Sequence, residues 1–214
     1  MARNPKPSGR KLADKGKRPG RAAIETRTPR PRFLIVCEGE KTEPNYFRGF
    51  RVNVDVEVVG AGMNTRSLVA HAKECAAKDS YTETWVVFDR DSFPAEHFNA
   101  AIELAKQEGF GVAYSNEAFE LWYVLHFNYL DNALHRGQYI DILTQKLGRK
   151  YKKNDPTLYE TLQPRQADAV RHARRLGQTY QQHHPAQDNP YTAVDELVVA
   201  LNPAVVELVE TNGL

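Results

Sequence analysis

The chain has 214 residues, of which 41% are hydrophobic and 26% are charged, so it can bury a globular core. Its formal net charge of +2 hides an uneven distribution. Residues 1–32 contain 11 of the 29 Lys and Arg residues and 2 of the 27 Asp and Glu residues, which gives this segment +9 and the remainder −7. The presence of only two cysteines excludes a disulfide framework.

Residues 1–31 are rich in Lys, Arg, Pro and Gly and contain almost no large apolar side chains. This composition predicts a disordered basic tail. Such a tail either contacts a polyanion such as nucleic acid or keeps the protein in solution, and the sequence leaves both alternatives open.

Three features of the sequence bear on the location of the protein. No apolar stretch is long enough to span a membrane, and no apolar segment of a secretory signal is found at the N-terminus. Cys37 lies in a predicted strand and Cys75 in a predicted helix. Two isolated thiols suit a reducing compartment, so we expect a cytoplasmic protein without a membrane partner.

Predicted strands and helices alternate in the segment 32–130. Short apolar runs rich in β-branched and aromatic residues predict strands at 32–37, 54–59, 85–88 and 112–114. Helical spacing predicts helices that open near residue 43 and cover 66–78, 95–108 and 119–129. This order predicts an α/β core with a parallel sheet of about four strands flanked by helices.

From residue 131 onward the patterns predict only helices. These helices are expected at 139–147, near 166–182 and near 193–201. We therefore divide the chain into a tail (1–31), a catalytic core (32–130) and a helical extension packed on the core (131–214).

Carboxylates follow two of the predicted strands directly. Glu38 follows the first strand, and Asp89 and Asp91 follow the third. Ligands bind beyond the carboxyl ends of strands in parallel sheets, so these acids can meet there if the two strands are neighbours. Carboxylate oxygens are the ligands that Mg²⁺ or Mn²⁺ prefers, and a cation would relieve their repulsion. An Asp-x-Asp triplet alone is weak evidence, because it also suits a solvated loop, phosphatases of the haloacid dehalogenase type and some glycosyltransferases.

Three residues near these acids are further candidates. Lys41 could bind a phosphate, whereas Glu43 is expected in the first turn of the following helix, where the helix dipole favours an acid. Glu120 lies inside a strongly apolar helix. We expect it either on an exposed stripe of that helix or turned toward the metal site, with an accessory catalytic role.

Basic residues in the predicted extension are candidates for substrate binding. Lys150, Lys152 and Lys153 lie in a basic loop. They could form a phosphate-tracking surface together with arginines of the next helix, namely Arg165, Arg171, Arg174 and Arg175. The alternative is an ordinary charged helix face.

Four segments of the chain resemble the Toprim domain of topoisomerases, primases and nucleases, and within that superfamily the RloB-like proteins of bacterial defence loci. They are residues 36–47 (VCEGEKTEPNYF), 87–91 (VFDRD), 115–122 (SNEAFELW) running on to 125–127 (LHF), and 189–192 (NPYT). The resemblance implies a Toprim fold with a helical extension, metal binding by Glu38, Asp89 and Asp91, and Glu38 as general acid/base. We expect Pro in the family where this chain has Glu117.

The resemblance implies a Mg²⁺-dependent nuclease that acts on DNA or RNA, including tRNA, in an antiphage or restriction-linked system. Such a nuclease could act with an ATPase partner, since this chain has no Gly-x-x-x-x-Gly-Lys-Ser/Thr loop. Two alternatives stay open: a non-catalytic nucleic-acid-binding module, and a small-molecule phosphotransferase that uses the same acids.

Overall fold

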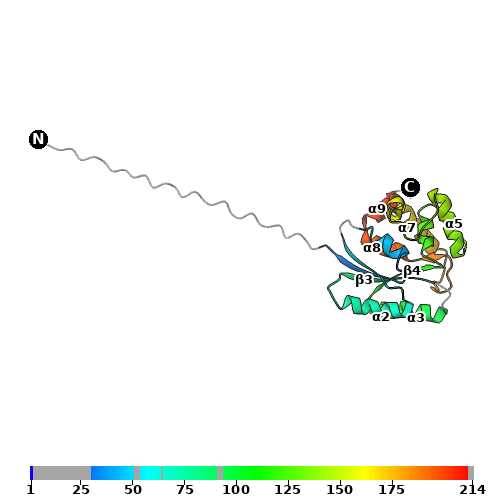
Figure 1. The fold of residues 1–214 in the computed structure, drawn as a ribbon, viewed down its shortest axis with the longest axis horizontal. Coiled ribbons are helices and arrows are strands. Elements are labelled where there is room, and N and C mark those ends of the chain that lie inside the picture. The colour runs from blue at the N-terminus through cyan, green and yellow to red at the C-terminus, as the bar shows by residue number, and fades with distance from the viewer. Residues whose placement is uncertain (2–29, 51–53, 64, 91–93, 212–214) are drawn as a thin grey trace.

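A five-stranded sheet with the strand order β2-β1-β3-β4-β5 forms the centre of the protein (Figure 1). The computed structural model describes residues 1, 30–50, 54–63, 65–90 and 94–211. The first four strands are parallel, and β5 pairs antiparallel with β4. The strands are β1 (Arg32–Cys37), β2 (Asp55–Gly60), β3 (Glu83–Asp89), β4 (Gly111–Asn116) and β5 (Tyr191–Thr192).

Helices cover both faces of this sheet (Figure 1). One face is covered by α2 (Thr65–Ala76) and α3 (Ala95–Gln107). The other face carries the remaining helices, which are α1 (Thr42–Phe47), α4 (Glu120–Leu125), α5 (Arg136–Leu147), α6 (Leu158–Leu162), α7 (Gln166–Gly177), α8 (Val194–Leu201) and α9 (Ala204–Thr211). A short 3₁₀ turn, Gln163–Arg165, joins α6 to α7.

The central strands are apolar along their whole length because both of their faces are buried. In β1, Ile35 packs in the core beneath α4, whereas Val36 packs in the core formed with α2 and α3. Val87 and Val86 of β3 divide between the same two cores. This arrangement confirms the predicted α/β architecture with a mainly parallel sheet.

The structure corrects the prediction in two places. The sheet has a fifth strand, so the expectation of helices alone after residue 131 is wrong at Tyr191–Thr192. Two residues are too few to show an alternating pattern, and their pairing with β4 is a tertiary contact. The helix expected at 119–129 is also shorter, since α4 ends at Leu125.

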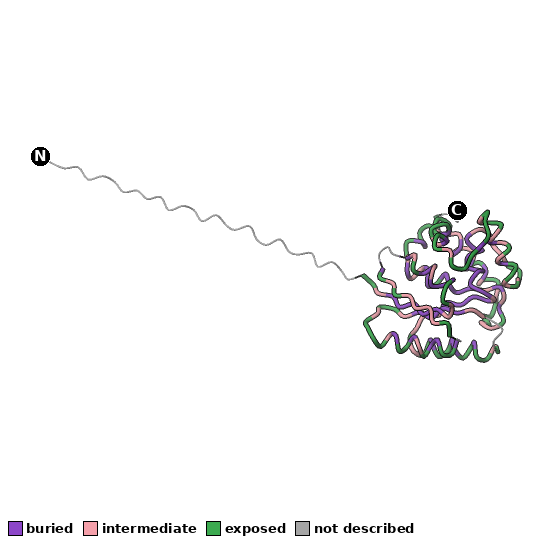
Figure 2. The backbone as a smooth tube through the Cα atoms, in the orientation of Figure 1, coloured by how far each residue is buried: buried purple, intermediate pink, exposed green. Residues whose placement is uncertain are grey.

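Residues before and after position 130 share one hydrophobic core. All six residues of α4 are buried, between the sheet and the helices of the extension. Tyr46 of α1 contacts the rings of Phe119 and Tyr123 and accepts a hydrogen bond from Gln166 of α7 at 3.3 Å. Figure 2 shows buried positions in the sheet and in the helices on both sides of it.

Within the described ranges, no helix is long and apolar enough to cross a membrane. The predicted tail at residues 1–31 lies almost entirely outside the residues that the structure describes.

Candidate active site

The parallel pairing of β1 with β3 brings Glu38 and Asp89 to the same edge of the sheet. The Glu38 amide donates to the Val87 carbonyl at 2.8 Å, and the Asp89 amide donates to the Glu38 carboxylate at 3.2 Å. Thr65, the first residue of α2, donates its hydroxyl to the other Glu38 oxygen at 3.3 Å. Glu38 is therefore held from two sides at the carboxyl end of the sheet. Asp91, the third predicted acid, lies outside the described residues.

Asp89 is poorly solvated in this arrangement. Its side chain is 15% exposed, and its Oδ1 atom is buried without a hydrogen-bond partner among the described residues. Burial, followed by the nearby charges of Glu43 and Glu120, raises the pKa of Asp89 well above its usual value. The guanidinium of Arg136 lies 3.7 Å from the other carboxylate oxygen and opposes this shift.

Glu43 is a member of the acidic cluster that sequence reasoning placed only in a helix turn. It does lie in the first turn of α1, as predicted, but its side chain turns inward and the residue is 6% exposed. Burial, followed by the charge of Glu120, raises the pKa of Glu43 to about 7. The carboxylate lies directly over Gly39, since a Cβ atom at that position would be 2.3 Å from Glu43 Oε2. Glycine at position 39 thus leaves the space that Glu43 occupies.

Glu120 is not on an exposed stripe, so that alternative is wrong. It is 2% exposed at the start of α4 and accepts a hydrogen bond from the Tyr151 hydroxyl at 3.2 Å. The ammonium of Lys153 lies 3.5 Å from the same oxygen. Its charge acts on both Asp89 and Glu43, which places Glu120 behind the acidic cluster.

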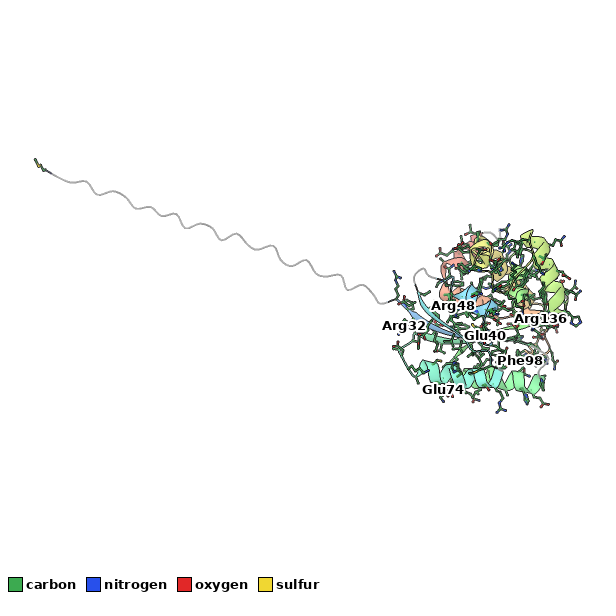
Figure 3. All side chains as sticks on the ribbon, in the orientation of Figure 1. Arg32, Glu40, Arg48, Glu74, Phe98 and Arg136 are labelled. Atoms are coloured by element: carbon green, nitrogen blue, oxygen red, sulfur yellow. The ribbon has the colours of Figure 1, made fainter. Side chains whose placement is uncertain are left out.

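These side chains surround an open pocket of about 380 Å³ at the carboxyl end of the sheet. Its lining combines acids at the base with cations at the rim: Glu38, Gly39, Glu40, Lys41, Thr42, Glu43, Asp89, Arg136 and Lys153. Figure 3 labels Arg136, the first residue of α5, and Glu40. Of the predicted site residues, Glu38, Asp89, Lys41 and Lys153 line the pocket, whereas Glu120, Lys150 and Lys152 do not.

Arg136 was missed because nothing in its local sequence marks it. It lies 46 or more residues away from the acids that it faces, and only the packing of α5 on α4 brings it to Asp89. Its backbone amide also donates to the Glu117 carboxylate at 3.3 Å, which fixes the start of α5 near the pocket.

The chemistry of the donors suits a hard divalent cation. Mg²⁺ is usually bound through one or two carboxylates and keeps several waters, and Glu38 and Asp89 provide two carboxylates at one sheet edge. The buried, unpartnered Asp89 Oδ1 is an oxygen that such an ion would satisfy. Among the described residues, no group of three or more His, Cys, Asp or Glu side chains is arranged to hold a metal ion.

The arginines of the α7 region are engaged in intramolecular contacts away from this pocket. Arg171 pairs with Asp168 at 2.6 Å, and the guanidinium of Arg175 lies 4.1 Å from the centre of the Tyr129 ring. Arg165 lies 5.4 Å from the Phe127 ring centre. These contacts favour the alternative of an ordinary charged helix face over a phosphate-tracking surface.

Comparison with known proteins identifies one family. No curated protein and no solved structure matches the chain detectably. The model of the RloB-like protein family matches residues 33–201, which include the whole sheet apart from Arg32, the acidic pocket and α1 to α8. The chain therefore belongs to the RloB-like protein family.

Proposed function

We propose that this protein is a metal-dependent nuclease that hydrolyses phosphodiester bonds at the pocket around Asp89. The observation that carries the proposal is the Asp89 carboxylate, which is held among other acids with one oxygen unpartnered. Burying repelling carboxylates is unfavourable, and a bound cation would remove that penalty. Arg136 and Lys153 at the rim suit an anionic substrate over a site that is otherwise acidic.

Glu38 and Asp89 would hold Mg²⁺ or Mn²⁺, together with Asp91 as the sequence indicates. When bound, the ion would offset the negative charge of the phosphodiester and lower the pKa of a water molecule. Lys41, which is exposed on the rim of the same pocket, is a further cation available to the substrate.

In the proposed reaction, the oxygen of water bonds to phosphorus and the bond from phosphorus to the leaving oxygen breaks. Glu38 takes the proton from the attacking water or returns one to the leaving oxygen, as the resemblance implies. Glu43 is a second carboxyl that can hold or release a proton near neutral pH, since its pKa is raised to about 7. Arg136 and Lys153 would neutralise the non-bridging oxygens of the phosphate.

The biological context belongs to the same proposal. A role in antiphage or restriction-linked defence, with an ATPase partner protein, rests on the resemblance to RloB-like proteins of defence loci. The substrate is DNA or RNA, and tRNA is one candidate.

The test measures cleavage of DNA and RNA, single- and double-stranded, with Mg²⁺, with Mn²⁺ and with a chelator. The chelator should abolish cleavage, and Asp89→Asn should reduce the rate by roughly a hundred-fold or more. The matched control is Asp55→Asn, since Asp55 is exposed at the start of β2, at the opposite end of the sheet.

Cleavage that proceeds at the wild-type rate in Asp89→Asn would overturn the assignment of the site. An intact metal-free protein that binds nucleic acid but never cuts it would favour the non-catalytic binding module. Transfer of phosphate from a nucleotide without cleavage of any polymer would favour the phosphotransferase.

A further inference from the structure

The loop between α5 and α6 is braced into one conformation. Gly148 ends α5 in the left-handed conformation, with φ of 65°. Arg149 forms an ion pair with Asp155 and donates to the Thr157 hydroxyl at 3.2 Å. Asp155 in turn accepts from the Thr157 amide at 2.9 Å and from its hydroxyl at 2.7 Å. These contacts join the two ends of the loop, which we call the basic loop (residues 148–157).

The inner side of the basic loop is attached to the wall of the acidic pocket. Tyr151 is 5% exposed, and its amide donates to the Thr144 hydroxyl at 3.2 Å. Its own hydroxyl and the ammonium of Lys153 both reach the Glu120 carboxylate. The position of the loop relative to the acids is therefore fixed.

The outer side of the basic loop presents two exposed lysines, Lys150 and Lys152. Neither forms an ion pair with any residue in the described part of the chain. They line a hollow of about 520 Å³ together with Arg149, Asn154, Asp155 and Pro156. The remainder of the chain after residue 32 carries a net charge of −7, so this hollow offers an anion a local positive region on an acidic body.

The hollow and the acidic pocket adjoin along the chain. Lys153 lines the acidic pocket, and its neighbour Lys152 lines the hollow. A strand with one phosphate over Asp89 can therefore place a further phosphate of its backbone at the hollow.

We propose that Lys150 and Lys152 bind backbone phosphates of a polynucleotide beside the phosphate at the acidic pocket. This proposal rests on the proposed nuclease function and extends it, because it names a polymer as the substrate. A mononucleotide would occupy the pocket alone and gain nothing from the hollow. The contacts are to phosphate, so they carry affinity without reading the base sequence.

The experiment compares binding of Lys150→Gln/Lys152→Gln with that of a control, Lys78→Gln/Lys106→Gln. The control removes the same charge from exposed lysines of the segment that contains α2 and α3, on the opposite face of the sheet. Fluorescence anisotropy measures binding of a dinucleotide and of a single strand of roughly twenty nucleotides, in chelator, so that no cleavage is needed. Thermal unfolding verifies that both variants fold.

For the long strand, we expect the loop variant to bind roughly tenfold more weakly and to show a salt dependence shallower by about one unit in log K against log salt. Binding of the dinucleotide and the behaviour of the control should match wild type. Equal loss in loop variant and control, or equal loss for both ligands, would overturn the proposal. Because the assay needs no catalysis, a chain that binds through the loop but never cleaves would refute the nuclease alone, and cleavage with no effect of the loop variant on binding would refute the loop proposal alone.

Discussion

Replacing Glu43 by Gln should stabilise the protein at alkaline pH. The folded protein must bury this carboxylate among other acids, and its pKa is accordingly raised from 4.5 to about 7. Between these values the folded state binds more protons than the unfolded state, so the free energy of unfolding falls as pH rises and the loss is complete above about 7. The residue is 6% exposed, so solvent screens the effect little.

The size of the effect follows from the shift of the pKa. At about 1.36 kcal/mol per pKa unit, ionised Glu43 costs about 3 kcal/mol of stability in the absence of metal. Gln fills a similar volume without a charge, so Glu43→Gln should be more stable than wild type by up to this amount near pH 8. For a domain of this size, that corresponds to a rise of roughly 6 to 12 °C in Tm.

Urea unfolding in chelator at about pH 4 and about pH 8 measures the difference. Near pH 4 the glutamate is largely protonated in both states, so the two proteins should have almost equal stability. Asp195→Asn is the matched control, because the pKa of Asp195 is also raised to about 7, by burial and by Glu196, in a residue that does not line the pocket. It should show the same dependence on pH, whereas Mg²⁺ should diminish only the advantage of Glu43→Gln. A gain of the same size at both pH values would refute the reasoning, since it could not come from ionisation.

Two further predictions follow from the contacts at Gly39 and from the charge of the first residues. Gly39→Ala should lower the free energy of unfolding by about 1 to 3 kcal/mol, because the new methyl group would overlap the Glu43 carboxylate, and should cost clearly less in a Glu43→Ala background; equal costs in both backgrounds would contradict that contact. Deleting residues 1–29 should leave Tm nearly unchanged and make nucleic-acid binding less dependent on salt, whereas equal salt slopes for both proteins would indicate a solubilising segment.

The sheet and the positions of Glu38 and Asp89 could be predicted because local patterns specify them. A continuous apolar run indicates a strand with two buried faces, and an acid at its end lies at the sheet edge whatever the rest of the chain does. The neighbourhood of β1 and β3 was an assumption of that prediction, and the strand order confirms it.

The other half of the pocket depends on contacts between distant segments. The pattern around Glu43 indicates a helix turn but not that α1 directs this residue against Gly39 and toward Glu120. Arg136 reaches Asp89 only through the packing of α5. The two-residue strand β5 is defined by its partner and not by its own sequence. Such features have no periodic signal, so the sequence could not show them.

The antiparallel pairing of β5 also determines what the sheet offers to other protein chains. An unprotected sheet edge is a template for pairing with a neighbour and hence for aggregation. On one side the parallel strands end in β5, which at two residues is too short to recruit a partner strand. On the other side the edge strand is β2, where Asp55 and Glu57 are exposed carboxylates that would face like charges in a second copy. Edge-to-edge association of this protein is therefore disfavoured at both ends of the sheet.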